Sequence, residues 1–240
     1  MKSLRILLIT AMCFALISCV DAQFYKTVRG NGNVVKKDRE ASYFDGVKVS
    51  TGIDVYLTQG DKEKIVVEAD ENIHEYLKTE IKGNVLHIYF DNVSIRDAET
   101  KKVYVTMKDV RSVKTSSAGD IYGETPIKTN LLEVGASSAG DIKLEVRARE
   151  VRVDISSSGN VTLTGEAEML EADLSSAGDL EAADLVVKEA NVDVSSAGDA
   201  RVNVSEKLVA RASSAGDITY WGNPKYIDAH ASSAGGIRKR

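Results

Sequence analysis

The chain has 240 residues and a formal net charge of −5; 28% of its residues are charged and only 6% are aromatic. A hydrophobic core must therefore be built mainly from small aliphatic side chains. Lysine and arginine form no block that alternates with aromatic residues, which argues against a nucleic-acid partner.

Residues 1–18 have the layout of a secretory signal peptide. Lys2 and Arg5 precede an apolar run, residues 6–17, that is too short for a stable membrane-spanning helix. The run ends in Leu-Ile-Ser-Cys, which resembles the lipobox of bacterial lipoproteins, where the cysteine is acylated and becomes the first mature residue. The alternative is an ordinary signal peptide in which Cys19 has no such role.

Cysteine usage favours the lipoprotein. Cys13 lies inside the apolar run, so cleavage would leave Cys19 as the single cysteine of an exported chain, with no partner for a disulfide. Acylation would account for this thiol and would hold the protein on a membrane. We predict lipid attachment at Cys19 and a place in the bacterial cell envelope, at the outer membrane, with the periplasmic or surface face left open.

Residues 19–43 are predicted to form a tether and a first edge strand, and residues 44–107 a β-rich part. Alternating apolar residues predict strands at 47–57, 65–67, 85–90 and 103–107. Segment 72–82 fits either a short helical stretch or a loop that enters a strand at 77–81, and Gly83-Asn84 predicts a hairpin turn. No linker follows, so we expect this part to cap the repeats of residues 108–240.

Those repeats carry the motif Ser-Ser-Ala-Gly-Asp or a close variant seven times. The successive first serines are separated by 21, 19, 19, 20, 18 and 19 residues: Ser116, Ser137, Ser156, Ser175, Ser195, Ser213 and Ser232. A fixed period near 20 residues indicates a solenoid, in which each repeat stacks on its neighbours.

The sequence around the motif predicts a right-handed, single-stranded parallel β-helix. Apolar residues occupy alternating positions five, three and one before each first serine, and again five after it. Period 2 on both sides of a bend describes strand, corner and strand, with polar residues on the outer face. Right-handed coiling is the rule for parallel strands joined by crossovers.

Each position of the motif has an expected role in the corner. The glycine is expected at a bend that needs either a positive φ or a close neighbouring backbone. By parity the second serine should point inward and form a ladder, and alanine should be small because the coil turns there. The aspartate should accept a hydrogen bond from a nearby backbone N–H.

The aspartates are also weak candidates for a calcium site, because stacking would align their carboxylates. One Gly-Asp per coil is fewer than a calcium-binding β-roll uses, so turn chemistry is the favoured interpretation and no cofactor is expected. The candidates are Asp120, Asp141, Asp179, Asp199 and Asp217.

The lead-in Val-Lys-Val-Ser-Thr-Gly-Ile-Asp-Val-Tyr-Leu-Thr-Gln-Gly at residues 47–60, the lipobox and the serial corners together resemble a known family. It is the head GIN domain, a domain of unknown function described in terms of auto-transporter adhesins and seen on Bacteroides-type envelope proteins. The resemblance spans roughly residues 44–239. It implies a parallel β-helix and an adhesin-like role, and it transfers no catalytic residue.

We therefore predict a non-enzymatic, lipid-anchored protein that presents a β-helical rod for adhesion or contact with other envelope proteins. Repeat steps of 18 to 21 residues leave little room for the long loops that surround active sites of β-helical enzymes. The alternative is a glycan-binding or glycan-active protein that uses the aromatic cluster Tyr220, Trp221 and Tyr226, although the same residues could cap the last coil.

Overall fold

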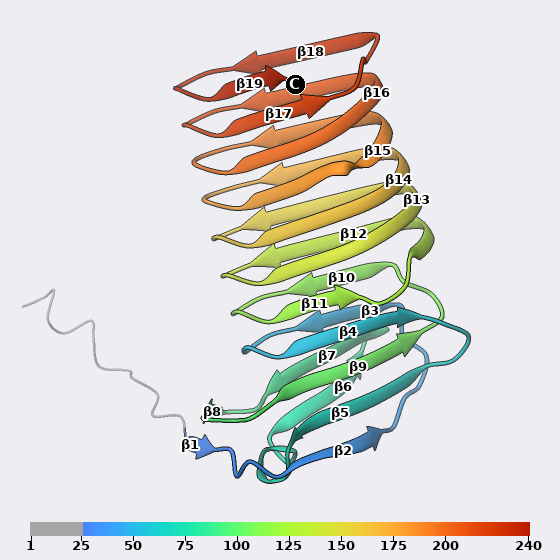
Figure 1. The fold of residues 1–240 in the computed structure, drawn as a ribbon, viewed down its shortest axis with the longest axis vertical. Coiled ribbons are helices and arrows are strands. Elements are labelled where there is room, and N and C mark those ends of the chain that lie inside the picture. Colours follow the sequence, from blue (N-terminus) through green and yellow to red (C-terminus); the bar gives the residue numbers. More distant parts are fainter. Residues whose placement is uncertain (1–25) are drawn as a thin grey trace, which may run out of the picture.

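The computed structural model describes residues 26–240, so the predicted signal peptide and Cys19 lie outside the described residues. Within residues 26–240 the chain is almost entirely strand, and its one helical element is a single 3₁₀ turn, η1 (Glu71–Ile73). No helix in this range is long and apolar enough to cross a membrane. Figure 1 shows a stack of flat coils with the amino-terminal strands at one end and the carboxyl terminus at the other.

The repeats form a parallel β-solenoid, as the sequence predicts. Each strand pairs in parallel with its counterpart one coil away. The strands are β10 (Ser112–Thr115), β11 (Asp120–Gly123), β12 (Ile127–Ser137), β13 (Asp141–Ser156), β14 (Asn160–Leu174), β15 (Asp179–Val194), β16 (Asp199–Ala212), β17 (Asp217–Trp221), β18 (Tyr226–Ala231) and β19 (Gly236–Lys239).

The core is a set of inward-facing columns at the positions that the alternation predicts. The residue five before the first serine stacks from coil to coil, and the members Leu132, Val151, Leu170, Ala190 and Leu208 are at most 3% exposed. In the last coil the same column continues as Ile227, which is 46% exposed. The aliphatic core thus runs the length of the coils and opens at their carboxyl-terminal end.

The amino-terminal part adds further layers to the same stack. Strands β3 (Gly46–Val49) and β4 (Asp54–Gln59) pair in parallel with β10 and β11, and β7 (Val85–Phe90) and β9 (Lys101–Met107) pair in parallel with β3 and β4. The sequence Ser-Thr-Gly-Ile-Asp at residues 50–54 loosely resembles the motif, and it joins β3 to β4 as a further corner of the solenoid.

Antiparallel strands then close this end. β5 (Lys64–Asp70) pairs with β9, β2 (Val34–Arg39) pairs with β5, and β6 (Leu77–Lys82) forms the predicted hairpin with β7. Both interpretations of segment 72–82 hold in part, because the 3₁₀ turn η1 ends at Ile73 and the chain then enters β6 at Leu77. β1 (Lys26–Arg29) and β8 (Val93–Arg96) form a separate two-stranded parallel sheet.

The expectation that the motif glycines have a positive φ is wrong. None of the seven motif glycines has a positive φ; the second serine does in every corner, from 49° to 66°. In five corners the following residue is also left-handed, and there the glycine N–H donates to the first serine carbonyl at 2.9–3.1 Å, for example Gly119 to Ser116. Two left-handed residues closed by this bond are typical of a type I′ turn.

The motif glycines are needed because the backbone of the neighbouring coil lies close to them, which is the other reason that the sequence suggests. A β-carbon on Gly159 would lie 2.6 Å from the carbonyl carbon of Ala136 in the preceding coil, and one on Gly198 would lie 2.7 Å from the carbonyl oxygen of Gly178. Real β-carbons essentially never come so near to backbone atoms. The glycine column therefore lets successive corners stack.

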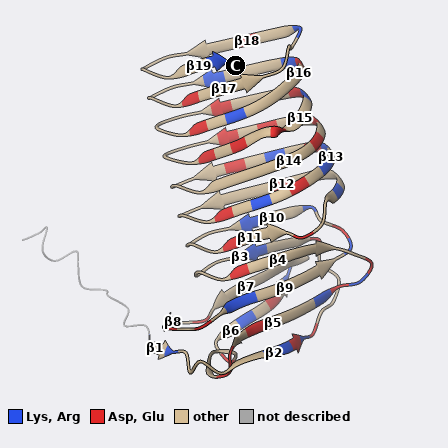
Figure 2. Ribbon diagram, viewed as in Figure 1, with Lys and Arg blue, Asp and Glu red and all other residues tan. Residues whose placement is uncertain are grey.

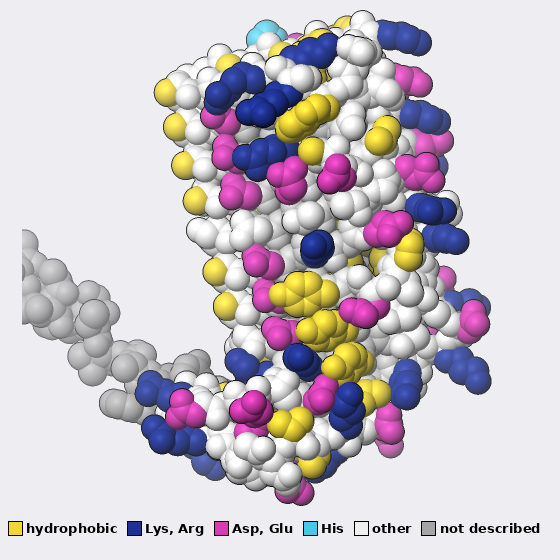
Figure 3. Space-filling view, in the orientation of Figure 1, with side chains coloured by type: hydrophobic (Ala, Val, Ile, Leu, Met, Phe, Trp, Pro, Cys, Tyr) yellow, Lys and Arg dark blue, Asp and Glu magenta, His cyan; other side chains and the backbone are white. Residues whose placement is uncertain are grey.

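The predicted inward serine ladder is wrong. The second serine and the residue after it are exposed in all seven corners, while the glycine is buried in six of them. The left-handed conformation turns both side chains outward at the tip of the corner, which period-2 parity cannot foresee. Alanine side chains at these tips form the column at the left edge of Figure 3.

Candidate functional site

The motif aspartates form one outward column, as the sequence predicts. The order from coil to coil is Asp120, Asp141, Asn160, Asp179, Asp199, Asp217 and Gly236. Asp54 and Lys102 extend the column into the amino-terminal layers, which the sequence analysis did not foresee. Figure 2 shows acidic residues next to the left-hand corners in coil after coil.

Several of these carboxylates are used in holding coils together. Asp120 Oδ1 accepts the backbone N–H of Asp141 at 3.1 Å, and Asp179 Oδ1 accepts that of Asp199 at 3.2 Å. The Asn160 amide donates to Asp141 Oδ1 at 2.7 Å. Burial, together with the charges of Asp141 and Asp54, raises the pKa of Asp120.

The carboxyl-terminal end of the column is neutralised by an arginine. Arg238 of β19 donates to the carboxylate of Asp217 in the coil before it. Among the described residues no group of three or more histidine, cysteine, aspartate or glutamate side chains is arranged to hold a metal ion. A calcium site on this column stays an untested prediction. The contacts described above are hydrogen bonds and an ion pair that join neighbouring corners.

A second acidic column, which the sequence analysis missed, lies on the face that leads into the corners. Asp154, Asp173 and Asp193 are register partners two residues before their first serines. They line a groove of about 350 Å³ together with Ser175 and Ser195. Burial and then the charge of Asp193 raise the pKa of Asp173. Aligning the repeats two positions before the first serine would have revealed this column.

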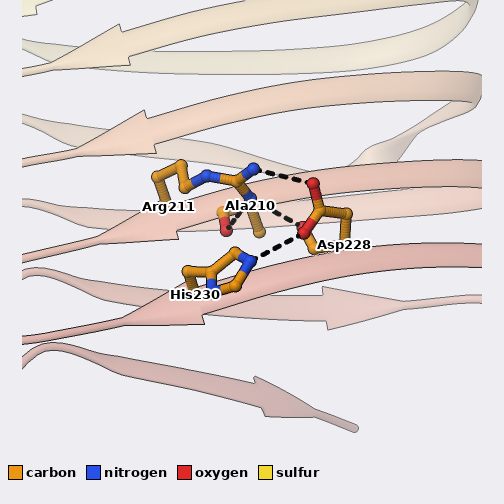
Figure 4. Close-up of polar contacts among 4 residues, drawn as sticks. All are labelled: Ala210, Arg211, Asp228 and His230. Atoms are coloured by element: carbon orange, nitrogen blue, oxygen red, sulfur yellow. Dashed lines mark hydrogen bonds and ion pairs between the residues drawn. The ribbon is translucent and has the colours of Figure 1, made fainter.

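Basic residues take over this column toward the carboxyl end. Arg211 is the register partner of Asp193, and His230 follows it. Figure 4 shows both side chains turned toward Asp228: Arg211 Nη2 lies 2.7 Å from Oδ2, and His230 Nε2 lies 3.0 Å from Oδ1. The hydrogen bond from Arg211 lowers the pKa of Asp228. Arg211 is thus already paired and closes the acidic groove.

Three tyrosines from distant parts of the sequence stack on one face. The ring centroids of Tyr56 and Tyr104 are 5.3 Å apart, and those of Tyr56 and Tyr122 are 5.6 Å apart. Figure 3 shows large hydrophobic side chains in a row on this face. The Tyr56 and Tyr104 rings are stacked with 23° between their planes, and the Tyr122 ring is tilted by 33° against that of Tyr56. This row strengthens the junction between the amino-terminal layers and the coils.

The structure separates the three aromatic residues of the predicted ligand cluster. Tyr220 is only 9% exposed and belongs to the core, whereas Tyr226 is 55% exposed. Trp221 is partly exposed and lines a hollow of about 480 Å³ with Arg201 and Arg238. Of the three arginines in this hollow, Arg201 is paired with Glu181 at 3.0 Å and Arg238 is paired with Asp217, and Arg240 is the third.

A further hollow of about 1180 Å³ lies where the amino-terminal layers meet the first long coil. It is bordered by the links β2–β3 and β9–β10, by the first part of β12 and by the middle of β13, on the side opposite the motif corners (Figure 1). Its lining includes Tyr43, Asn84, Asp109, Lys128, Asn130 and Arg147. The sequence analysis did not single out these residues, because they come together only in the fold.

The family model for "Putative auto-transporter adhesin, head GIN domain" matches residues 43–224. This match covers most of the chain, including the repeated corners of the solenoid. The chain therefore belongs to the head GIN domain family. No match was found among curated proteins.

Solved structures of several bacterial proteins have the same fold. A "putative adhesin" of Bacteroides fragilis matches with a TM-score of 0.81 at 20% identity, over 89% of this chain and 100% of that one. A "putative lipid binding protein" of Parabacteroides distasonis gives 0.74 at 24% identity, covering 90% and 100%. A "putative adhesin" of Parabacteroides merdae gives 0.68 at 21%, covering 90% and 99%. At these identities the likeness is one of fold.

Proposed function

We propose that this protein is lipid-anchored in the bacterial cell envelope through Cys19 and presents its solenoid as a rigid rod for adhesion or protein contact, without catalysis. The family description supports an adhesin-like role. The lipobox-like end of the apolar run supports the anchor. These two supporting observations are independent of one another, so the anchor and the adhesive role each need a readout of their own.

The observation that carries the proposal is the parallel stack from β12 to β16, in which the pairing resumes after each register shift. Four successive pairs of long strands stack in parallel, and ion pairs join the outer faces of neighbouring coils, such as Arg152 with Glu171 at 3.4 Å and Lys207 with Glu189 at 3.6 Å. No long loop interrupts these coils. Such a stack holds its surface in fixed positions over several coils, which suits a display platform.

The serines of the corners give no support to nucleophilic catalysis. A catalytic serine needs a general base within hydrogen-bond reach. Within residues 26–240 no serine hydroxyl is hydrogen-bonded to a histidine or a carboxylate; those of Ser175 and Ser195 lie near backbone carbonyls of the preceding coil. This is consistent with a structural role for the motif.

Glycan binding around Trp221 remains a second candidate, favoured by the partly exposed indole beside a polar hollow. Aromatic faces stack on sugar rings, and Trp221 is the single tryptophan of the chain. A glycan array on the wild type and on Trp221→Ala tests it. Binding that survives the substitution would exclude this site.

The anchor and the adhesive role are tested together in bacteria that express the full chain. Wild type and Cys13→Ser should incorporate radiolabelled palmitate, and Cys19→Ser should not. Cells with the wild-type chain should adhere to mucin-coated and protein-coated surfaces more than cells with an empty vector, and Cys19→Ser should lose this gain. An unlabelled wild type would contradict the anchor, and adhesion equal to the vector control would contradict the adhesive role.

A further inference from the structure

The hollow at the junction exists because β12 is longer than the strand beneath it. β12 has 11 residues and β10 has four, and only Glu133 to Ala136 of β12 pair with β10. The first part of β12 therefore pairs on one side with β13 and, among the described strands, has no strand partner on the other. Outward side chains of this part of β12, among them Lys128 and Asn130, line the hollow.

Two basic side chains stand next to one another at this overhang. Lys128 on β12 and Arg147 on β13 are direct register partners in neighbouring coils, which places their backbones roughly 4.8 Å apart. Both residues are exposed and both line the hollow. Like charges directly opposite one another are unfavourable unless an anion relieves them.

Neither of these cations has a partner within the part of the chain that the structure describes. No carboxylate of residues 26–240 lies within ion-pair distance of Lys128 Nζ or of the Arg147 guanidinium. Elsewhere on the rod a basic residue commonly meets an acidic one in the next coil, as in Lys114–Glu133, Lys188–Glu168 and Arg201–Glu181. Carboxylates line the hollow too: Asp45 is paired with Arg111 at 3.9 Å, Glu133 is paired with Lys114 at 3.4 Å, and Asp109 accepts a hydrogen bond from Tyr43. Lys128 and Arg147 are therefore the cations of the lining that have no acidic partner within residues 26–240.

The other lining groups suit a sugar better than a bare anion. The Tyr43 side chain is 48% exposed, while its neighbour Phe44 is fully buried and anchors the backbone beside it. The Tyr43 hydroxyl donates to Asp109 at 3.4 Å, which limits rotation of the ring. The side-chain amides of Asn84 and Asn130 line the same hollow and make no hydrogen bond within residues 26–240.

We propose that this hollow binds a carboxylated sugar of an acidic polysaccharide. Arg147 and Lys128 hold the carboxylate, Tyr43 packs against the pyranose ring, and the two asparagine amides bind hydroxyl groups. The inference rests on the proposed adhesive role and names its ligand class. It differs from the Trp221 hollow, where Arg201 and Arg238 are already paired with acids, and from the acidic groove, which would repel the same ligand.

The test is calorimetric titration of the full chain, purified in detergent, with trigalacturonate, glucuronate oligomers and sialyllactose, and with maltotriose as the neutral control. At least one acidic probe should bind and maltotriose should not. Arg147→Gln and Lys128→Gln should each weaken binding by about tenfold or more, because a charged hydrogen bond is lost. Tyr43→Ala should weaken it similarly, and Tyr43→Phe should retain most of it.

Matched controls lie on the same elements. Lys143→Gln removes one exposed positive charge from β13 four residues before Arg147 and outside the lining of the hollow, and Tyr226→Ala removes an exposed tyrosine at the far end; neither should affect binding. Circular dichroism and urea midpoints will show whether each variant is folded. These substitutions are on the surface, so folding should be retained.

Three outcomes would overturn the inference: no binding of any acidic probe, binding undiminished by Arg147→Gln and Lys128→Gln, or inorganic phosphate binding as tightly as the sugar and displacing it. The last result would define a bare anion site. If the probes fail while cells with the wild-type chain still adhere to coated surfaces, only this inference is wrong and the adhesive role stands.

Discussion

The side-chain amide of Gln59 pairs with the backbone of Lys128 as a neighbouring strand would. Its Oε1 accepts the Lys128 N–H at 2.7 Å, and its Nε2 donates to the Lys128 carbonyl at 3.0 Å and to the Lys108 carbonyl at 3.1 Å. The amide thus occupies part of the place that β10 leaves empty beneath β12. It also fixes the backbone that carries one of the two basic side chains of the hollow.

Gln59→Glu should therefore lower the free energy of unfolding by about 1–2 kcal/mol, because a carboxylate cannot donate to the two carbonyls. Urea denaturation followed by circular dichroism measures this. Asn84→Asp is the matched control, since that side chain lines the same hollow without a hydrogen bond among the described residues. Equal effects of the two substitutions would show that the Gln59 amide has no special role.

At the corners, Gly159→Ala should destabilise the protein by about 1–3 kcal/mol, since the new methyl group would overlap the backbone of Ala136. Ser158→Gly should change stability by less than about 1 kcal/mol, because Ser158 already has a φ of 63° and glycine relieves that strain while adding freedom to the unfolded chain. Urea midpoints compare the two. Equal destabilisation would contradict the assignment of the left-handed positions.

His74 should make stability depend on pH. It is 4% exposed, and its Nε2 lies 3.0 Å from the Val35 carbonyl, which can only accept, so Nε2 carries the proton. Burial, followed in smaller measure by the charges of Lys37 and Arg39, lowers the pKa of His74. The unfolded chain, with an ordinary pKa of about 6.5, then binds more protons than the folded chain below that pH.

Stability should therefore fall as the pH is lowered from 7.5 to 5, by at most about 1.4 kcal/mol per pH unit from this group. His74→Gln should have a shallower slope over the same window, measured by urea midpoints at each pH. His230→Gln, at an exposed position, is the control. A slope unchanged by His74→Gln would assign the effect to other groups.

Asp173→Asn should stabilise the protein at pH 7. Folding raises the pKa of Asp173, so the ionised carboxylate is less favourable in the folded chain than in the unfolded chain. The charged aspartate therefore lowers the free energy of unfolding at pH 7. The gain should shrink as the pH falls through the raised pKa of the folded state and should be absent below the ordinary aspartate pKa of about 3.9, where the carboxyl is protonated in both states. Asp184→Asn, at an exposed site, should give no comparable gain. Thermal unfolding at pH 7 and pH 3.5 would measure both, and a loss of stability at pH 7 would contradict the expectation.

Calcium should not change the thermal unfolding temperature appreciably. Asp120 and Asp179 already accept backbone N–H groups of the next coil, and Asp217 is paired with Arg238. Melting curves with calcium and with chelator test this directly. An upward shift of several degrees with calcium, lost in Asp141→Asn, would instead support a cation on the motif column.

The repeat period and the apolar alternation were enough to predict the architecture. The residues that lie five positions before the first serine of each motif had to share one face of the coil. If each repeat forms one coil, stacking the coils then requires the parallel pairing seen from β12 to β16. The hairpin at Gly83-Asn84 and the glycine column were likewise readable, because they depend on local turn chemistry and on an exact repeat. The lipid site at Cys19 rests on sequence alone.

Only the tertiary structure decided where the chain departs from that regularity. Whether Gly119 or Ser117 takes the left-handed conformation depends on the approach of the neighbouring coil, which local pattern does not contain. Tyr43, Lys128 and Arg147 lie far apart in the sequence and meet because β10 is shorter than β12. A repeated pattern specifies the coils themselves. The surface where the amino-terminal layers meet the repeats depends instead on the lengths and the register of the strands that pair there.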